Sequence, residues 1–472
     1  MRKILFACLI FTGLVLFFSA CEDYNDLTAP APIDFGSADF SRFVSIGNSL
    51  TMAEQSQSVF ESSQKYSFGK LIADLVSTTY EQAIFSDPGT GDRLEIKSLD
   101  LANGVVEIVE NPEQGSPTNL NYPAPYNNLG IKGAFLKDVL NARDATTCYT
   151  NNLPPPLNIY NTPNPLFDAV LRGLGTQMEL AMAQQPTLVT LWIGNNDILA
   201  FATRGGLFPI TDPQTSFAPD YNTILNNLEN VGAQVVMANI PDVKNIPFFK
   251  TVGPGIGLKL QENQIPGMVY QTTSGIGQAT VNDLCSLNVL VLLTGSSAAS
   301  LIGDVTGAYY SLNGIPVPPN VNTAYPFGLA AENPWPNNLI LDPTEMSIVD
   351  QIVAAYNGII NAEATARNFA VVDIHELLNQ IGEPGGIVVD GITFSSEFIL
   401  GNTYSLDGVH PTTQGYGLVA NAFIETINEK YGASIPLINV ASLPGSLILE
   451  GVSMGKYGIP NIPHGALDNV IF

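Results

Sequence analysis

Residues 42–50 read RFVSIGNSL, a short apolar run that stops on glycine, asparagine and serine. Such a run predicts a buried strand that ends at Gly47, and the apolar spacing of residues 68–76 predicts a helix further on. Open α/β sheets place their sites at the carboxyl ends of their strands. Ser49 is therefore either an ordinary turn serine or a nucleophile held at the end of a strand.

Runs of the same kind recur along the chain and alternate with helical patterns. Further strands are predicted at 127–131, 187–194, 233–240 and 369–374, and helices at 134–142, 165–185, 222–232, 343–366 and 413–431. Continuous apolar strands that alternate with helices are typical of a parallel sheet covered on both faces. The sequence therefore predicts an α/β fold with five central strands.

Three stretches interrupt this alternation. Residues 77–122 resemble a hairpin-like excursion, residues 250–340 are rich in Gly, Pro, Asn and Thr, and residues 433–472 form a C-terminal extension. We interpret the first two as insertions in one domain that covers residues 41–432. A separate domain at 250–340 is the alternative.

Composition excludes several classes of function. The chain has 43 acidic and 18 basic residues and a net charge of -25, so it repels phosphate backbones and nucleic-acid binding is not expected. Its three histidines are scattered, and no cysteine pair has the spacing of a zinc site. No nucleotide-binding fingerprint is present. We therefore expect neither a metal nor a cofactor.

The N-terminus has the pattern of a targeting segment. Two basic residues precede an apolar stretch at 4–18, and small residues precede Cys21. This pattern resembles a bacterial lipobox, which implies a signal peptide at 1–20, a lipidated Cys21 and a tether at 21–40. The protein would then be exported and anchored by lipid to the cell envelope, at the outer membrane or the cell surface. The alternative is an ordinary secretory signal that contains a cysteine.

Two cysteines remain in the folded part of such a protein, Cys148 and Cys285. In an oxidising compartment they could form a disulfide. Two buried free thiols are the alternative, and the spacing does not decide between them.

A candidate general base is found in the segment SLDGVHPTTQGYG at residues 405–417. Asp407 precedes His410 by three residues, so its carboxylate can reach Nδ1 and hold the tautomer whose Nε2 accepts a proton. The alternative is a loop histidine beside a capping aspartate.

Candidate donors to an oxyanion follow two other predicted strands. Asn196 lies in LWIGNND at 191–197, and Gly133 lies in NLGIKGA at 128–134. A glycine can offer its N–H without a Cβ in the way, and an asparagine can offer its amide. Ser49 would add its own N–H at the start of a helix, where the helix dipole is positive.

Together, and in this order, these segments resemble the SGNH/GDSL hydrolase family. The four family blocks match Gly47–Leu50, Gly133, Gly194–Asp197 and Asp407–His410. The resemblance implies a flavodoxin-like three-layer α/β/α sandwich and the activity of an esterase or lipase. It implies that Ser49 is the nucleophile, that His410 is the base and that Asp407 orients the histidine. It also implies an oxyanion hole formed by Ser49, Gly133 and Asn196. Asn48 replaces the aspartate of the first block, and Gly130 competes with Gly133.

Two other patterns could be mistaken for a site. Gly451–Gly455 reads GVSMG, a nucleophile elbow, but α/β-hydrolases need an acid and a histidine after the serine, and only His464 follows. We interpret it as a turn. His375 lies beside Asp373 but lacks the helical pattern of 413–431 that follows His410.

The sequence thus predicts a serine hydrolase that cleaves carboxylic esters. The substrate would be either an acyl lipid or an acetylated polysaccharide. The alternative from another class is a surface binding or adhesion lipoprotein that keeps the fold without turnover.

Overall fold

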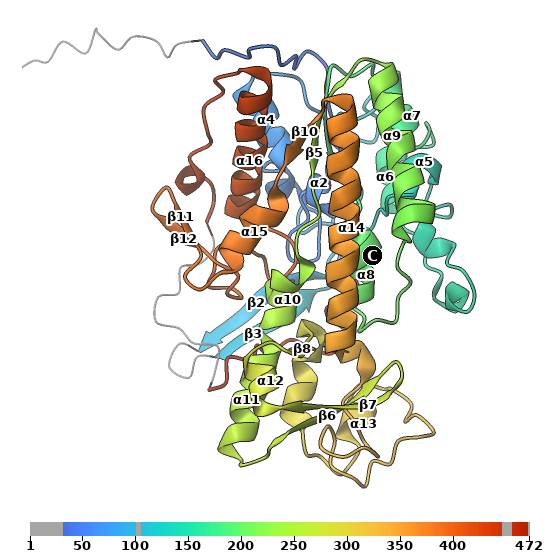
Figure 1. Ribbon diagram of the computed structural model, residues 1–472, viewed down its shortest axis with the longest axis vertical. Coiled ribbons are helices and arrows are strands. Elements are labelled where there is room, and N and C mark those ends of the chain that lie inside the picture. The colour runs from blue at the N-terminus through green and yellow to red at the C-terminus, as the bar shows by residue number, and fades with distance from the viewer. Residues whose placement is uncertain (1–31, 101–104, 446–455, 471–472) are drawn as a thin grey trace, which may run out of the picture. The chain divides into compact units, whose positions relative to one another are not determined.

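The computed structural model describes residues 32–100, 105–445 and 456–470, and Phe35–Phe472 forms one compact unit (Figure 1). Cys21, the predicted signal peptide and the elbow at Gly451–Gly455 lie outside the described residues. Among the helices described, none is both long and apolar enough to cross a membrane.

Four parallel strands form the central sheet. They are β1 (Phe43–Gly47), β4 (Leu188–Trp192), β5 (Gln234–Ala238) and β10 (Ala370–Val372), in the spatial order β1-β4-β5-β10. Phe43 pairs with Leu188, and Leu188 pairs with Gln234. Every residue of β1 and β4 is buried, which explains why both strands are apolar without alternation. The four carboxyl ends lie at one edge of the sheet.

The predicted fifth strand does not form as a strand. Residues 127–131 run parallel to β1 but make only isolated bridges, from Asn128 to Ser45 and to Gln82. The physical reason lies in the asparagine, whose Nδ2 donates to Thr51 O (2.8 Å) and whose Oδ1 accepts from Gly130 N (2.9 Å). The first bond ties the segment to α2 and the second closes a turn at Gly130, so this segment stays outside the described four-stranded sheet.

Helices cover the two faces of the sheet, as Figure 1 shows. One face carries α4 (Phe68–Leu75) and α16 (Thr413–Tyr431), and the other carries α7 (Gln177–Ala183), α9 (Ala218–Asn230) and α14 (Pro343–Arg367). The arrangement is a three-layer α/β/α sandwich, as the sequence predicts.

The remaining elements connect or extend these layers. The other helices are α2 (Ser49–Met52), α3 (Glu61–Gln64), α5 (Asp138–Asn141), α6 (Leu166–Leu171), α8 (Asn196–Ala202), α10 (Pro247–Lys250), α11 (Val252–Glu262), α12 (Val281–Cys285), α13 (Ala308–Leu312) and α15 (Ile374–Gly382). The other strands form four antiparallel pairs, β2 (Arg93–Asp100) with β3 (Val105–Asn111), β6 (Gly267–Thr272) with β7 (Gly275–Thr280), β8 (Leu290–Val291) with β9 (Ile340–Leu341), and β11 (Ile387–Val389) with β12 (Ile392–Phe394).

Local sequence signals set the ends of the helices next to the site. The Thr412 side chain accepts a hydrogen bond from Gly415 N (3.0 Å) and starts α16, two residues after His410. At the other end, Gly432 has a φ of +65°, which suits glycine and ends the helix. The cap at Thr412 therefore places the histidine loop at a defined point above the sheet.

Chain segments outside the sandwich pack against it. The stretch 77–122 contains the β2–β3 hairpin, and the apolar patch 287–295 contains β8, which is buried against β9. From the C-terminal extension, Asn461 bridges to Glu107 of β3, and the carbonyl of Ala466 accepts from Gln57 Nε2 (2.8 Å). The described end of the chain is thus bonded to the loop that follows α2.

The two cysteines of this unit are free thiols, so the possible disulfide does not form. Cys148 is buried, and its Sγ lies 3.1 Å from the carbonyl oxygen of Ala145. Cys285 is exposed at the end of α12, which also corrects the expectation of two buried thiols. The two residues belong to different parts of the fold, and neither thiol meets a sulfur partner.

Candidate active site

Ser49 lies at the carboxyl end of β1, as the first residue of α2. Asn48 caps this helix, since its Oδ1 accepts from Leu50 N (3.2 Å). Gly47 is required by close packing, because a Cβ there would lie 2.0 Å from Thr51 Oγ1. Because α2 has only four residues, its dipole adds less at Ser49 than the sequence suggests. The position of the serine is therefore fixed by the strand and the cap.

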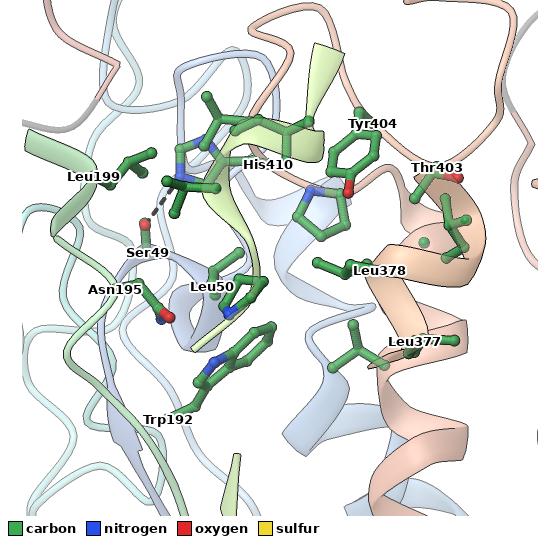
Figure 2. Close-up of a pocket in the computed structure, with 18 of the residues that line it drawn as sticks. Ser49, Leu50, Trp192, Asn195, Leu199, Leu377, Leu378, Thr403, Tyr404 and His410 are labelled. Carbon is green, nitrogen blue, oxygen red and sulfur yellow. Dashed lines mark hydrogen bonds between the residues drawn. The ribbon is translucent and has the colours of Figure 1, made fainter. Parts of the chain in front are cut away.

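His410 connects Ser49 to Asp407, as Figure 2 shows for the bond to the serine. Its Nε2 is 2.9 Å from Ser49 Oγ, and its Nδ1 is 3.0 Å from Asp407 Oδ2. An ionised carboxylate can only accept, so Nδ1–H donates to Asp407 and Nε2 accepts from the serine hydroxyl. The structure thus brings the three residues together in the order serine, imidazole, carboxylate.

The turn at Asp407 explains why an aspartate and a glycine precede the histidine. Asp407 Oδ1 accepts from Val409 N and from His410 N, both at 2.8 Å, and Oδ2 also accepts from Gln57 N (2.8 Å). Gly408 has a φ of +69°, and a Cβ there would lie 2.9 Å from Phe248 N. Three backbone N–H groups therefore hold the Asp407 carboxylate, in addition to its bond with the His410 imidazole.

Burial and charge act against each other in this pair. Burial raises the pKa of Asp407, but the charge and hydrogen bonds of His410 outweigh it and the pKa is lowered overall. Burial lowers the pKa of His410, but the negative charges of Glu54 and Asp407 outweigh it, so the pKa is raised above its ordinary value near 6.5. Lys132 opposes that rise. The imidazole is a stronger base than an isolated histidine.

Asn196 and Asp197 connect the end of β4 to the segment that contains Gly133. Asn196 Nδ2 donates to the carbonyl of Ala134 (2.9 Å), and Asp197 Oδ2 accepts from Leu136 N (2.9 Å). Burial raises the pKa of Asp197 to about 6. The GNND block thus positions the glycine segment, in addition to placing its own amide near Ser49 in the same pocket.

Gly130 and Gly133 differ in what their backbone can offer. The N–H of Gly130 donates to Asn128 Oδ1 (2.9 Å), and a Cβ there would lie 2.7 Å from Met52 N. Gly133 has a φ of +76°, in the left-handed region that favours glycine. Gly130 serves packing against α2, which leaves Gly133 as the candidate donor of this segment.

An apolar pocket opens beside Ser49 and His410 (Figure 2). Its apolar lining comes from the end of β4, the 241–246 loop, α15 and α16, and includes Trp192, Val243, Leu377, Leu378, Ile381 and Leu418. Tyr404 and Thr403 line the side next to the histidine loop. The hydroxyl and imidazole therefore lie at one end of a hydrophobic recess.

Two residues of this region were not predicted. Asn195 is buried and lines the pocket, and neither atom of its amide has a hydrogen-bond partner within the described residues. Glu54 is fully buried with Oε2 3.3 Å from His410 Nε2. The doubled asparagine of GNND was the sequence signal for Asn195. No sequence signal pointed to Glu54, which lies in the mixed segment TMAEQSQS at 51–58.

His375 and Asp373 form their described hydrogen bonds with other groups and not with each other. His375 Nδ1 lies 3.0 Å from the carbonyl of Ile240, while Asp373 Oδ1 accepts from Glu376 N (3.0 Å) and caps α15. Asn239 bonds both residues, through the His375 N–H and the Asp373 carboxylate. This second pair therefore stabilises the start of a helix.

Glu54, Asp407 and His410 are close enough for one ion to contact all three. However, backbone N–H groups and the imidazole already bond both oxygens of Asp407, and the Lys132 ammonium lies 2.8 Å from Glu54 Oε1. A cation would have to displace these donors. The cluster is better suited to protons than to a metal.

The family model described as GDSL-like Lipase/Acylhydrolase matches residues 43–423, from the first residue of β1 into α16. No curated protein matches the chain. The matched region contains Ser49, Gly133, Asn196, Asp407 and His410.

Proposed function

The chain belongs to the GDSL-like lipase/acylhydrolase family, a family of ester hydrolases, and we propose that it is a serine esterase whose nucleophile is Ser49. One observation carries the proposal: His410 lies between Ser49 Oγ (2.9 Å) and Asp407 Oδ2 (3.0 Å) beside an apolar pocket. These distances are within the range that proton transfer requires.

In the first half of the reaction, Ser49 Oγ attacks the ester carbonyl carbon while His410 Nε2 takes the hydroxyl proton. Asp407 stabilises the imidazolium through the Nδ1–H bond. The tetrahedral intermediate then collapses, the C–O bond to the alcohol breaks, and the imidazolium gives its proton to the leaving oxygen. The product is an acyl-serine and a free alcohol.

Charge on the carbonyl oxygen is stabilised by donors at the strand ends. We assign this role to the N–H groups of Ser49 and Gly133 and to the Asn196 amide. Each such donor lowers the barrier by roughly 3 kcal/mol. Water then attacks the acyl carbon while His410 Nε2 takes its proton, the bond from that carbon to Ser49 Oγ breaks, and the imidazolium returns the proton to Oγ as the acid leaves.

The shape of the pocket supports an acyl chain as the group bound beside Ser49. Leu377, Leu378 and Ile381 of α15 line the pocket together with Trp192 and Leu418, and Figure 2 shows Leu377, Leu378 and Trp192 beside it. Burying each methylene there contributes about 0.8 kcal/mol. Because the lining is mostly apolar, we propose acyl lipids as the substrate class over acetylated polysaccharide.

We also propose that the enzyme works at the cell envelope, anchored by lipid on Cys21. The signal-like residues before Cys21 support this proposal. Metabolic labelling with a fatty acid would give a labelled wild type and an unlabelled Cys21→Ala variant. Equal labelling of both would contradict the proposal.

Hydrolysis of p-nitrophenyl esters from acetate to palmitate tests the function. The wild type should cleave them with a kcat/KM that rises from acetate to medium chains, while Ser49→Ala should be inactive. A flat series, or a maximum at acetate, would support deacetylation instead. Absence of turnover in the wild type would favour a binding protein, and an active Ser49→Ala variant would contradict our choice of nucleophile.

A further inference from the structure

A second carboxylate lies against the catalytic imidazole, on the edge opposite Asp407. Glu54 Oε2 is 3.3 Å from His410 Nε2, the same nitrogen that is 2.9 Å from Ser49 Oγ. The Glu54 side chain is completely buried. A buried carboxylate needs a partner, and a structural partner alone would not require this proximity to the reacting nitrogen.

Backbone bonds hold Glu54 in this position. The residue before it, Ala53, has a φ of +67° and ends α2, and the Glu54 N–H donates to the carbonyl of Ser49 (3.1 Å). The Tyr416 hydroxyl, from α16, donates to the carbonyl of Glu54 (2.8 Å). Glu54 is therefore tied both to the nucleophile's own turn and to the helix that follows the histidine.

Lys132 balances the charge of Glu54. Its ammonium lies 2.8 Å from Glu54 Oε1 and donates to the carbonyl of Gln57 (2.8 Å), and its side chain is 8% exposed. Gln57 in turn donates its N–H to Asp407 Oδ2. The pair is neutral as a whole, but its negative end is the end that meets His410.

The charged and titratable groups around His410 come from four segments of the chain. They are Asp407 on its own turn, Glu54 after α2, Lys132 beside the candidate oxyanion glycine, and Tyr416 on α16. Lys132 is the one cation among these four, and it is paired with Glu54.

We propose that Glu54 is a positioning residue that stabilises the imidazolium of His410 on its Nε2 edge, and that Lys132 limits this effect. This inference rests on the proposed function. In the neutral ring, Nε2 accepts from Ser49 and offers Glu54 no hydrogen. After the serine proton moves to Nε2, the new N–H lies between Ser49 Oγ and Glu54 Oε2. The carboxylate thus interacts more strongly with the state that forms during the reaction.

The arrangement has a consequence for pH. A carboxylate that favours the imidazolium also protonates the resting base at a higher pH, and a protonated base cannot accept the serine proton. The raised pKa of His410, to which the charge of Glu54 and the charge and hydrogen bond of Asp407 contribute, agrees with this geometry. Glu54 makes His410 a stronger base and moves its working range upward in pH.

The direct test is titration of His410 by NMR in the protein labelled with ¹⁵N-histidine, without residues 1–21. The chain has only His375, His410 and His464, and the spectrum of His410→Gln identifies the signal. In Glu54→Gln the midpoint for His410 should fall by about one pH unit. In Lys132→Met, which leaves Glu54 without its cation, it should rise.

Two further variants separate charge from folding. Glu54→Asp keeps a carboxylate, so its midpoint should stay nearer to the wild type than that of Glu54→Gln. Glu345→Gln changes another buried glutamate, whose Oε2 accepts from the N–H of Asp342 at the start of α14, and should leave the midpoint unchanged. If both Glu54 variants moved the midpoint equally, distortion of the loop would explain the shift and the proposal would be wrong.

The pH profile of ester hydrolysis supplies the second readout. The acid limb of kcat/KM should shift down in Glu54→Gln by the same amount, and kcat on the alkaline plateau should drop roughly threefold to tenfold because the base is weaker. An unmoved His410 midpoint in the NMR titration would overturn the inference whatever the turnover. If Glu54→Gln shifts the His410 midpoint but the wild type does not hydrolyse esters, only the proposed function would be contradicted.

Discussion

His410 and His375 both stand close behind an aspartate near the carboxyl edge of the sheet, but they differ in what their polar atoms meet. His410 is almost fully buried and bonds Ser49 and Asp407 through its two ring nitrogens. His375 is half-buried and bonds a backbone carbonyl, while Asp373 caps α15. An aspartate close before a histidine therefore forms a candidate catalytic pair only where a third residue, distant in sequence, lies at the other ring nitrogen of the histidine.

The largest expected difference comes from removing each imidazole. His410→Ala should lower kcat by about 10⁴–10⁶, because His410 Nε2 is the group that accepts from Ser49 Oγ and the nearby Glu54 carboxylate is already paired with Lys132. His375→Ala should leave kcat close to the wild-type value. Single-turnover measurement of p-nitrophenyl ester hydrolysis compares the two variants. A similar loss of kcat in both variants would contradict the different roles that we assign to His410 and His375.

Removing each carboxylate should give the next largest difference. Asp407→Asn should reduce kcat by about 10⁴, because an amide can donate to Nδ1 and stabilise the wrong tautomer. Asp373→Ala should leave kcat unchanged and cost about 1 kcal/mol of unfolding free energy through loss of the α15 cap. Steady-state kinetics and urea denaturation measure these two effects. Retention of most activity in Asp407→Asn would show that another group orients the ring.

The asparagine beside each histidine distinguishes rate from stability. Asn196→Ala should lower kcat about 10²–10³-fold through loss of an oxyanion donor. Asn239→Ala should cost about 1–3 kcal/mol of unfolding free energy, since it leaves the His375 N–H and the Asp373 carboxylate without their partner. The same assays apply. An Asn196→Ala variant that loses stability but not kcat would place it with Asn239.

The smallest effect is a displacement along the pH axis. Because the pKa of His410 is raised, kcat/KM should fall with decreasing pH at a midpoint above 6.5. Below that midpoint each pH unit should cost about tenfold, as the fraction of neutral imidazole decreases. A profile from pH 5 to 9 with a fixed ester measures the midpoint. A value at or below 6.5 would mean that burial outweighs the two carboxylates.

The parts that sequence could predict are those built from short-range patterns. Apolar runs predict β1, β4, β5 and β10, and Gly408 between Asp407 and Val409 predicts the turn before the histidine. The family motifs then supply the order of the blocks. Their catalytic roles stay predictions, although the structure brings Ser49, Asp407 and His410 within hydrogen-bond distance.

What sequence could not predict depends on packing between distant segments. Glu54 and Lys132 carry no motif, and the contacts of Glu54 with Lys132 and with His410 exist only once α2 meets the glycine segment. The fifth strand is reduced to isolated bridges because the Asn128 side chain bonds Thr51 of α2 and Gly130 of its own turn. Both cases show side chains deciding structure that backbone periodicity leaves open.

The bond between Ser49 and His410 joins residues 361 positions apart, and this separation has a consequence for timing. A ribosome that adds about 5–20 residues per second needs roughly 20–70 s to travel from one to the other. During that interval the nascent chain contains Ser49 without His410, so the reaction that we propose cannot take place. The proposed activity can begin only after α16 has been synthesised and has packed against the sheet. The growing chain is therefore inactive during most of its synthesis.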